Sequence, residues 1–313
     1  MPLRIVFMGT AELACASLKA LLHCGSCEVV AAVTRPDRPK GRDLKAQPPP
    51  VKMMAVEAGL RVLQPESARD PAFAAELAAL RPDVMVVAAY GQILPQAALD
   101  LPRFGCVNVH ASLLPKYRGA APIQWAILNN EPQTGVSIMK MAAGLDTGDI
   151  LSQCATPIGP DDTAAALHER LAVMGGELLT ATLPAYVAGA ITPQPQDNAA
   201  ATYARKITKA DGRMDWSRPA LELRNRIRAF TPWPGAFVNW RAHGQPRLLK
   251  IWRAQVEPRQ GPAGQVLQAD KTGLVVACGT DSLRLEQLQL EGGRKMTAAE
   301  FLAGHDLKPG FFS

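Results

Sequence analysis

Residues 106–150 read CVNVHASLLPKYRGAAPIQWAILNNEPQTGVSIMKMAAGLDTGDI. The stretch opens with a short apolar strand that carries Asn108 and delivers His110 from its C-terminal end. A second strand is predicted over 136–141, and it leads into the tight loop GLDTGD at residues 144–149. Polar groups at the carboxyl ends of strands line the ligand crevice of an open α/β sheet. The stretch therefore predicts a doubly wound sheet with a polar site at that edge.

Three side chains from this stretch form a chemically coherent set. Asn108 offers an N–H donor that does not titrate, and His110 can donate and shuttle protons near neutral pH. Asp146 can orient the imidazole and favour its charged form. Such groups suit an acyl carbon that passes through a tetrahedral oxyanion. No Ser or Cys lies in a nucleophile-elbow sequence, so the attacking group is expected to belong to the substrate.

Each of these residues alone has a structural explanation, since a strand-end His is usually a core residue and an Asp in a Gly-rich loop is usually a turn former. The combined pattern, N-V-H-x-S-L-L-P followed by G-L-D-T-G-D, resembles the folate-dependent formyltransferase family. The resemblance extends from FMGT near the N-terminus to RAFTPWPGAF near residue 235. The chain departs from the family's usual residues at Ala11, Leu13 and Ala111.

The resemblance implies an enzyme that transfers a formyl group from 10-formyltetrahydrofolate without a metal. SLLPKYRGAAPIQWAI is most similar to members that formylate the α-amine of initiator methionyl-tRNA for translation initiation. The family's catalytic positions fall on Asn108, His110 and Asp146. Its folate-binding turn falls on four consecutive residues, which are Ser112, Leu113, Leu114 and Pro115.

The N-terminal half alternates short apolar strands with amphipathic helices, which predicts a parallel, Rossmann-like sheet. The predicted strands are 3–8, 27–34, 61–63, 84–88 and 106–109, and the predicted helices are 12–22, 51–58, 70–80 and 162–188. The continuous apolar run VMVVAA is typical of a strand buried on both faces. The first strand is followed by neither G-x-G-x-x-G nor a P-loop lysine, so no dinucleotide site is expected.

The C-terminal part changes in style after a Pro-rich segment, GAITPQPQDNAAA. A helix over 218–230 precedes five short strands broken by Gly and Pro, predicted at 237–240, 248–256, 264–268, 273–277 and 282–290. This spacing predicts a small OB-like β-barrel. The sequence is therefore divided into a catalytic domain (1–189), a linker (190–205) and a basic OB-like domain (206–313).

Positive charge is concentrated in two places. Residues 1–200 carry a net charge of −2 and residues 201–313 one of +8, within a total of +6. A basic barrel beside a nearly neutral domain indicates a polyanionic partner, although a soluble surface would also fit. The loop RPDRPKGRDLKAQPPP is long for a βα connection and also basic. The resemblance assigns this loop to tRNA, and the predicted tRNA contacts are Arg38, Lys40 and Arg42 in the loop and Lys206 at the start of the basic domain.

Other features of the sequence bear on the cellular location of the protein. The N-terminus enters a strand directly, so no signal peptide is expected, and no apolar run reaches membrane-spanning length. The six cysteines show no disulfide framework, which favours a reducing cytoplasm. We expect a cytoplasmic monomer whose partners are tRNA and tetrahydrofolate, with no membrane and no metal.

Two other functions remain open at this point. One is a different folate enzyme, either a formylfolate hydrolase or a formyltransferase for amino sugars or ribonucleotides. The basic loop and barrel count against so small an acceptor. The other is a non-catalytic RNA-binding protein with a dead site, and the joint presence of all three polar residues counts against that.

Overall fold

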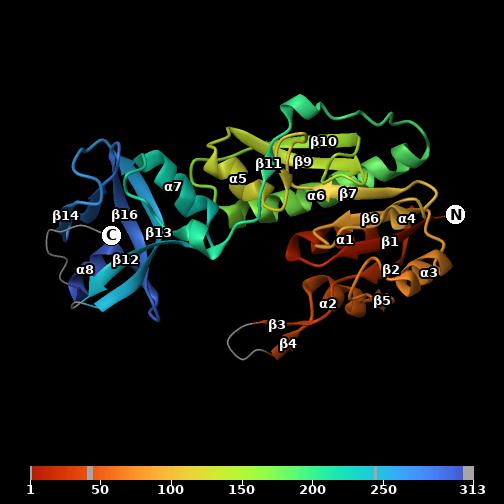
Figure 1. Ribbon diagram of the computed structural model, residues 1–313, viewed down its shortest axis with the longest axis horizontal. Helices are drawn as coiled ribbons and strands as arrows, with labels where there is room; N and C mark the ends of the chain where they lie inside the picture. Colours follow the sequence, from red (N-terminus) through yellow and green to blue (C-terminus); the bar gives the residue numbers. More distant parts are fainter. Residues whose placement is uncertain (1, 41–44, 243–244, 306–313) are drawn as a thin grey trace. The chain divides into compact units, whose positions relative to one another are not determined.

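The computed structural model describes residues 2–40, 45–242 and 245–305 and divides into two compact units. Unit 1 comprises Met1–Pro122, Gln133–Pro157 and His168–Ala204, and unit 2 comprises Ile123–Pro132, Ile158–Leu167 and Arg205–Ser313. Each unit has its own sheet (Figure 1). No helix in the described ranges is long and apolar enough to span a bilayer.

Unit 1 is organised around a seven-stranded sheet of order β10-β9-β7-β6-β1-β2-β5. Five neighbouring strands of this sheet, β7, β6, β1, β2 and β5, are parallel to one another. Strand β9 runs antiparallel to β7, and β10 runs antiparallel to β9. The strands of unit 1 are β1 (Leu3–Gly9), β2 (Cys27–Val33), β3 (Arg38–Lys40), β4 (Lys45–Gln47), β5 (Val62–Leu63), β6 (Val84–Ala88), β7 (Cys106–His110), β8 (Arg118–Gly119), β9 (Gln133–Lys140), β10 (Ile150–Pro157) and β11 (Tyr203–Ala204).

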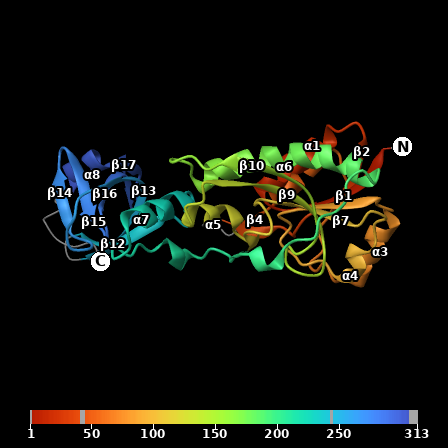
Figure 2. The same cartoon turned by 90° about the horizontal axis from the view of Figure 1, so that it is seen from above.

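Helices cover both faces of this sheet, with α1 and α6 on one face and α3 and α4 on the other (Figure 2). The helices up to residue 200 are α1 (Glu12–Leu22), α2 (Pro50–Glu57), α3 (Pro71–Ala79), α4 (Gln96–Leu99), α5 (Pro122–Leu128) and α6 (Ala164–Val187), with a 3-10 turn η1 (Asn198–Ala200). Nearly all of α5 and the first turn of α6 belong to unit 2. Every residue of β6 is buried, as its unbroken apolar sequence predicts. Asp70 caps α3 by accepting a hydrogen bond from the Ala72 N–H, and Pro71 begins the helix.

Unit 2 contains an antiparallel sheet of order β12-β13-β16-β15-β14, with β17 paired to β16. Its elements are η2 (Lys209–Gly212), α7 (Ala220–Ala229), β12 (Ala236–Ala242), β13 (Gln245–Glu257), β14 (Val266–Asp270), β15 (Gly273–Ala277), β16 (Ser282–Leu290), β17 (Lys295–Thr297) and α8 (Ala298–Gly304). Leu223 and Ile227 of α7 and Phe301 of α8 lie in one apolar core with the inward side chains of the sheet. This burial holds the two helices to the sheet.

Unit 2 also includes two segments from earlier in the chain. Arg228 of α7 is 9% exposed and donates hydrogen bonds to the backbone carbonyls of Gly159 and Asp162. Arg224 forms a 2.9 Å ion pair with Asp161. The basic C-terminal part therefore folds together with residues 158–167, which the sequence patterns assign to the catalytic domain.

The architecture confirms the predicted Rossmann-like sheet and the small β domain after it. All five predicted C-terminal strands and the helix before them are present, each bound lying within three residues of the predicted one. The sequence patterns missed β10, because its alternation is broken by polar residues on an edge strand, and they missed β17 and α8. The division at residues 189 and 205 stays a prediction.

The capping box at the start of α8 should make the stability of the fold depend on pH. Thr297 and Glu300 form a capping box, and hydrogen bonds from the Thr297 N–H, then Arg294 and the Thr297 hydroxyl, lower the pKa of Glu300 to about 2. A depressed carboxyl pKa stabilises the folded state above the unfolded pKa of about 4.3, and that stability is lost as the pH falls towards 2. Glu300→Gln should therefore lower the melting temperature at pH 7 and flatten its decline in acid. Thermal melts at a series of pH values would measure this, and parallel curves for Glu300→Gln and wild type would contradict it. Glu291→Gln, at an exposed carboxylate, is the control.

Candidate active site

The predicted polar residues meet at the carboxyl end of β7. Asn108 and His110 are two positions apart on this strand, so their side chains project from the same face of the sheet. The intervening Val109 lies on the opposite face, where a side chain at Gly175 of α6 would contact it. Asn108 is 9% exposed and His110 is 6% exposed. Both groups are thus held by a rigid strand and shielded from most solvent.

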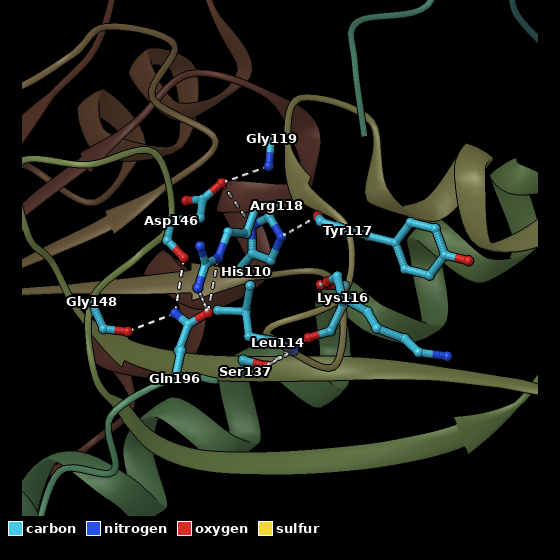
Figure 3. Close-up of polar contacts among 11 residues, drawn as sticks. His110, Leu114, Lys116, Tyr117, Arg118, Gly119, Ser137, Asp146, Gly148 and Gln196 are labelled. Carbon is cyan, nitrogen blue, oxygen red and sulfur yellow. Dashed lines mark hydrogen bonds and ion pairs between the residues drawn. The ribbon is translucent and has the colours of Figure 1, made fainter. Parts of the chain in front are cut away.

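His110 lies between two oxygen atoms (Figure 3). Its Nε2 is 2.9 Å from the Tyr117 carbonyl oxygen, and its Nδ1 is 3.7 Å from Asp146 Oδ2. A carbonyl can only accept, so Nε2 carries a hydrogen and donates it to Tyr117. Only the doubly protonated ring can also direct an N–H towards the Asp146 carboxylate. The ring is therefore held between a backbone carbonyl on one side and a carboxylate on the other.

Asp146 is fixed by the turn in which it lies. Its backbone is left-handed, with φ of 51°, a conformation that Asp tolerates better than most residues. Its Oδ2 accepts a 2.8 Å hydrogen bond from the Gly119 N–H, and this is the same oxygen that faces His110. A Cβ at Gly148 would lie 1.7 Å from the Lys140 carbonyl oxygen, so the loop returns to β9 only with glycine there. The loop thereby brings a carboxylate from outside β7 to the imidazole.

The turn at Ser112, Leu113, Leu114 and Pro115 follows β7 directly and is held from beneath by Ser137 of β9. The Ser137 hydroxyl donates to the Ser112 carbonyl at 2.6 Å and accepts from the Leu114 N–H at 3.0 Å. Gln153 of β10 donates to both the Leu114 carbonyl and Ser137 Oγ. Ser137 is fully buried. No sequence pattern indicated Ser137 or Gln153, because each acts through hydrogen bonds to residues that are remote in sequence.

The backbone just beyond this turn meets residues that the sequence patterns assigned to a linker. Arg118 is only 2% exposed, and its guanidinium donates to the side-chain oxygens of Gln196 and Asn198. Gln196 in turn donates to the Asp146 carbonyl at 2.8 Å and to the Gly148 carbonyl at 2.6 Å (Figure 3). No sequence pattern predicted a role for either amide side chain. Their only signal was polar residues in a Pro-rich segment.

The predicted tRNA contacts are only partly described. Arg38 is exposed on β3 and forms a 2.8 Å ion pair with Glu66. Lys206 is exposed in unit 2. Arg42 and the side chain of Lys40 lie outside the described residues. The structure thus places Arg38 and Lys206 on the surfaces of separate units.

The arrangement is suited to acyl transfer to an external nucleophile. Burial, with a smaller effect from Asp100, raises the pKa of the Cys106 thiol to about 12, so this strand residue is unsuited to attack. Within the described ranges, no group of three or more His, Cys, Asp or Glu side chains could hold a metal ion. What the site offers is an amide, an imidazole and a carboxylate, which can stabilise developing negative charge and move protons.

Comparison with known proteins agrees with this chemistry. The family profile described as formyl transferase matches residues 3–183, and the one described as its C-terminal domain matches residues 206–306. The methionyl-tRNA formyltransferase of Citrifermentans bemidjiense is 49% identical over 308 residues, covering 98% of this chain and 95% of that protein. That of Myxococcus xanthus is 52% identical over 307 residues, covering 98% and 96%. The sugar 3N-formyl transferase WlaRD shares the fold, with a TM-score of 0.65 at 18% identity over 91% of this chain and 98% of that one.

The support that Ser137 gives to the turn can be tested by mutation. Ser137→Ala would leave the buried Leu114 N–H and Ser112 carbonyl without this partner, which costs ~1–3 kcal/mol. We therefore expect a lower free energy of unfolding in chemical denaturation and, because the turn is predicted to border the folate, weaker binding of a formylfolate analogue. Ser152→Ala, which removes the 2.6 Å hydrogen bond between a β10 hydroxyl and Thr182, should leave folate binding unchanged. Normal stability and normal folate affinity in Ser137→Ala would contradict this reading of the turn.

Proposed function

The chain belongs to the formyl transferase family, and from that premise we propose that it transfers a formyl group from 10-formyltetrahydrofolate to the α-amine of initiator methionyl-tRNA. The observation that carries the chemistry is the placement of His110 between the Asp146 carboxylate and a backbone carbonyl at the end of β7. The acceptor is supported by relatives named methionyl-tRNA formyltransferase, which match 98% of this chain. The product would serve translation initiation.

In the proposed reaction, the neutral α-amine attacks the formyl carbon and a tetrahedral oxyanion forms. Asn108 and protonated His110 stabilise that oxyanion by hydrogen bonding. The oxyanion competes with the Tyr117 carbonyl for the Nε2–H of His110, so this 2.9 Å bond weakens as charge develops. Asp146 keeps the ring oriented and accepts the amine proton through water. When the C–N bond to the folate nitrogen breaks, His110 supplies the proton to that nitrogen, and formylated product and tetrahydrofolate leave.

The folate is proposed to bind along Ser112, Leu113, Leu114 and Pro115. Leu114 is 3% exposed, and both its N–H and its carbonyl are bonded from strands beneath. The turn is therefore fixed before any ligand binds, which lowers the entropy cost of recognition. No cofactor beyond this co-substrate is proposed.

For the acceptor we propose contacts from Arg38, Lys40, Arg42 and Lys206. Unit 2 supports a polyanionic ligand in another way, through Trp252 of β13. Lys295 Nζ lies 3.8 Å from the centroid of this ring and Lys250 Nζ lies 5.3 Å from it. Cations gathered at a half-exposed aromatic ring suit phosphate and base contact. We further propose that the enzyme acts as a monomer, with the trio and the turn supplied by one chain, and that it is cytoplasmic, in keeping with its free cysteines.

One assay separates the proposed function from its rivals. The protein is incubated with 10-formyltetrahydrofolate, with and without methionyl-tRNA, and the release of tetrahydrofolate is followed. We expect release only when the charged tRNA is present. Release without any acceptor would identify a hydrolase, release with an amino sugar or ribonucleotide but not with tRNA would identify a small-acceptor enzyme, and binding without turnover would identify a non-catalytic protein.

The three proposed catalytic residues are expected to act in the chemical step. Asn108→Ala, His110→Ala and Asp146→Asn should each lower turnover by ~100-fold or more while folate affinity changes little. Asn is chosen at position 146 because it tolerates the left-handed backbone. His23→Ala, an exposed histidine at the end of α1, is the matched control. Near-normal turnover in His110→Ala would refute the mechanism.

The contribution of the charged side chains to tRNA binding should be measurable from its salt dependence. The double variant Arg38→Gln/Lys206→Gln should bind methionyl-tRNA more weakly, and the slope of log affinity against log salt should become shallower by ~1 for each phosphate that is no longer neutralised. Folate binding should be unaffected. Arg69→Gln, at another exposed arginine of unit 1, should change neither quantity. An unchanged slope in the double variant would remove these residues from the tRNA interface.

A further inference from the structure

The segment between α6 and unit 2 returns along the turn that follows β7 and becomes part of unit 1. Its strand β11 pairs in parallel with β8, with Tyr203 opposite Arg118 and Ala204 opposite Gly119. The Arg118 N–H donates to the Thr202 carbonyl at 2.8 Å. A Cβ at Gly119 would lie 2.8 Å from the Ala204 carbonyl oxygen, so the two backbones approach as closely as glycine permits. This segment is thus packed against the site.

Arg118 of β8 determines how the side chain of Gln196, in this segment, is oriented. The guanidinium has donors only, and its Nε and Nη2 lie 3.0 and 2.9 Å from Gln196 Oε1. The amide oxygen must therefore face Arg118, and the amide nitrogen must point the other way. Asn198 accepts a further hydrogen bond from the same guanidinium at 2.9 Å. The buried charge thereby fixes the direction in which Gln196 donates.

The donors of Gln196 point at the loop that carries Asp146. Nε2 lies 2.8 Å from the Asp146 carbonyl oxygen and 2.6 Å from the Gly148 carbonyl oxygen (Figure 3). Both amide hydrogens are thus used on the two carbonyls that flank Thr147. The Asp146 side chain is held separately, by the Gly119 N–H at 2.8 Å, and Gly119 is itself part of β8.

We propose that Gln196, oriented by Arg118, is a positioning residue for the reaction: it holds the backbone of the Asp146 loop so that the carboxylate faces His110. The inference rests on the proposed catalytic role of Asp146 and extends it to a residue 50 positions later in the chain. Without this clamp the loop can shift, and a displacement of ~1 Å at a reacting group costs ~100-fold in rate. The segment before unit 2 therefore completes the catalytic site.

The first test is the split between kcat and KM in the full-length protein. Gln196→Ala should lower kcat by ~10–100-fold, with KM for 10-formyltetrahydrofolate and for methionyl-tRNA unchanged. Gln194→Ala is the matched control, because this glutamine lies two residues earlier and its exposed side chain donates to the Thr192 carbonyl within the same segment. Wild-type kcat in Gln196→Ala would overturn the proposal. So would a KM effect alone.

Gln196→Glu distinguishes the clamp from simple neutralisation of Arg118. A carboxylate still accepts from the guanidinium, but its second oxygen would face the carbonyls of Asp146 and Gly148 without a hydrogen to donate. We expect kcat to fall at least as far as in Gln196→Ala while the melting temperature stays near that of the wild type. Wild-type kcat in Gln196→Glu would show that only the pairing with Arg118 matters, and would refute the clamp.

A double-mutant cycle then tests whether Gln196 acts through Asp146. If it does, Gln196→Ala combined with Asp146→Asn should be no slower than Asp146→Asn alone. Multiplicative losses in kcat would contradict the inference, since Gln196 would then act by another route. If Asp146→Asn itself kept normal turnover, the proposed function of the trio would fail. If Asp146→Asn were impaired and Gln196→Ala normal, only the positioning role would fail.

Discussion

The buried guanidinium of Arg118 is the constraint on which the rest of the site depends. A charge that is 2% exposed must find acceptors inside the protein, because leaving it unpaired would cost several kcal/mol. The acceptors are two side-chain amides, those of Gln196 and Asn198, from a segment that lies far away in sequence. Satisfying this one side chain therefore brings in the segment, and the segment in turn holds the loop of Asp146.

The proposed catalytic side chains come from two kinds of structure, a rigid strand and a loop. Asn108 and His110 come from a strand in the middle of the sheet, where neighbours on both sides fix them. Asp146 comes from a loop, and three contacts to its backbone or carboxylate replace the support that a strand would give. The proposed chemistry needs no nucleophile from the protein, so what the fold would supply is precision of placement.

The sequence was informative where function depends on neighbours along the chain. The alternation of Asn108 and His110 on one strand, the turn after it and the Gly-rich loop of Asp146 were all visible as local patterns, and the structure brings His110 and Asp146 together as expected. Ser137, Gln153 and Gln196 could not be found in this way, because each acts through hydrogen bonds to partners that are remote in sequence. A Pro-rich segment looks like a spacer by composition, since composition does not show which backbone groups it will satisfy.

The pairing of β8 with β11 also bears on the order in which the enzyme is made. Tyr117 and Thr202 are bonded across 85 residues of sequence. At typical rates of synthesis, on the order of ten seconds separate their emergence. A nascent chain can thus assemble the central sheet and carry Asn108, His110 and Asp146 while the loop is still unsupported. The proposed catalytic site is complete only after the last residues before unit 2 have been synthesised. On the proposed role of Gln196, fraying of this segment in the finished protein would slow catalysis and leave the sheet intact.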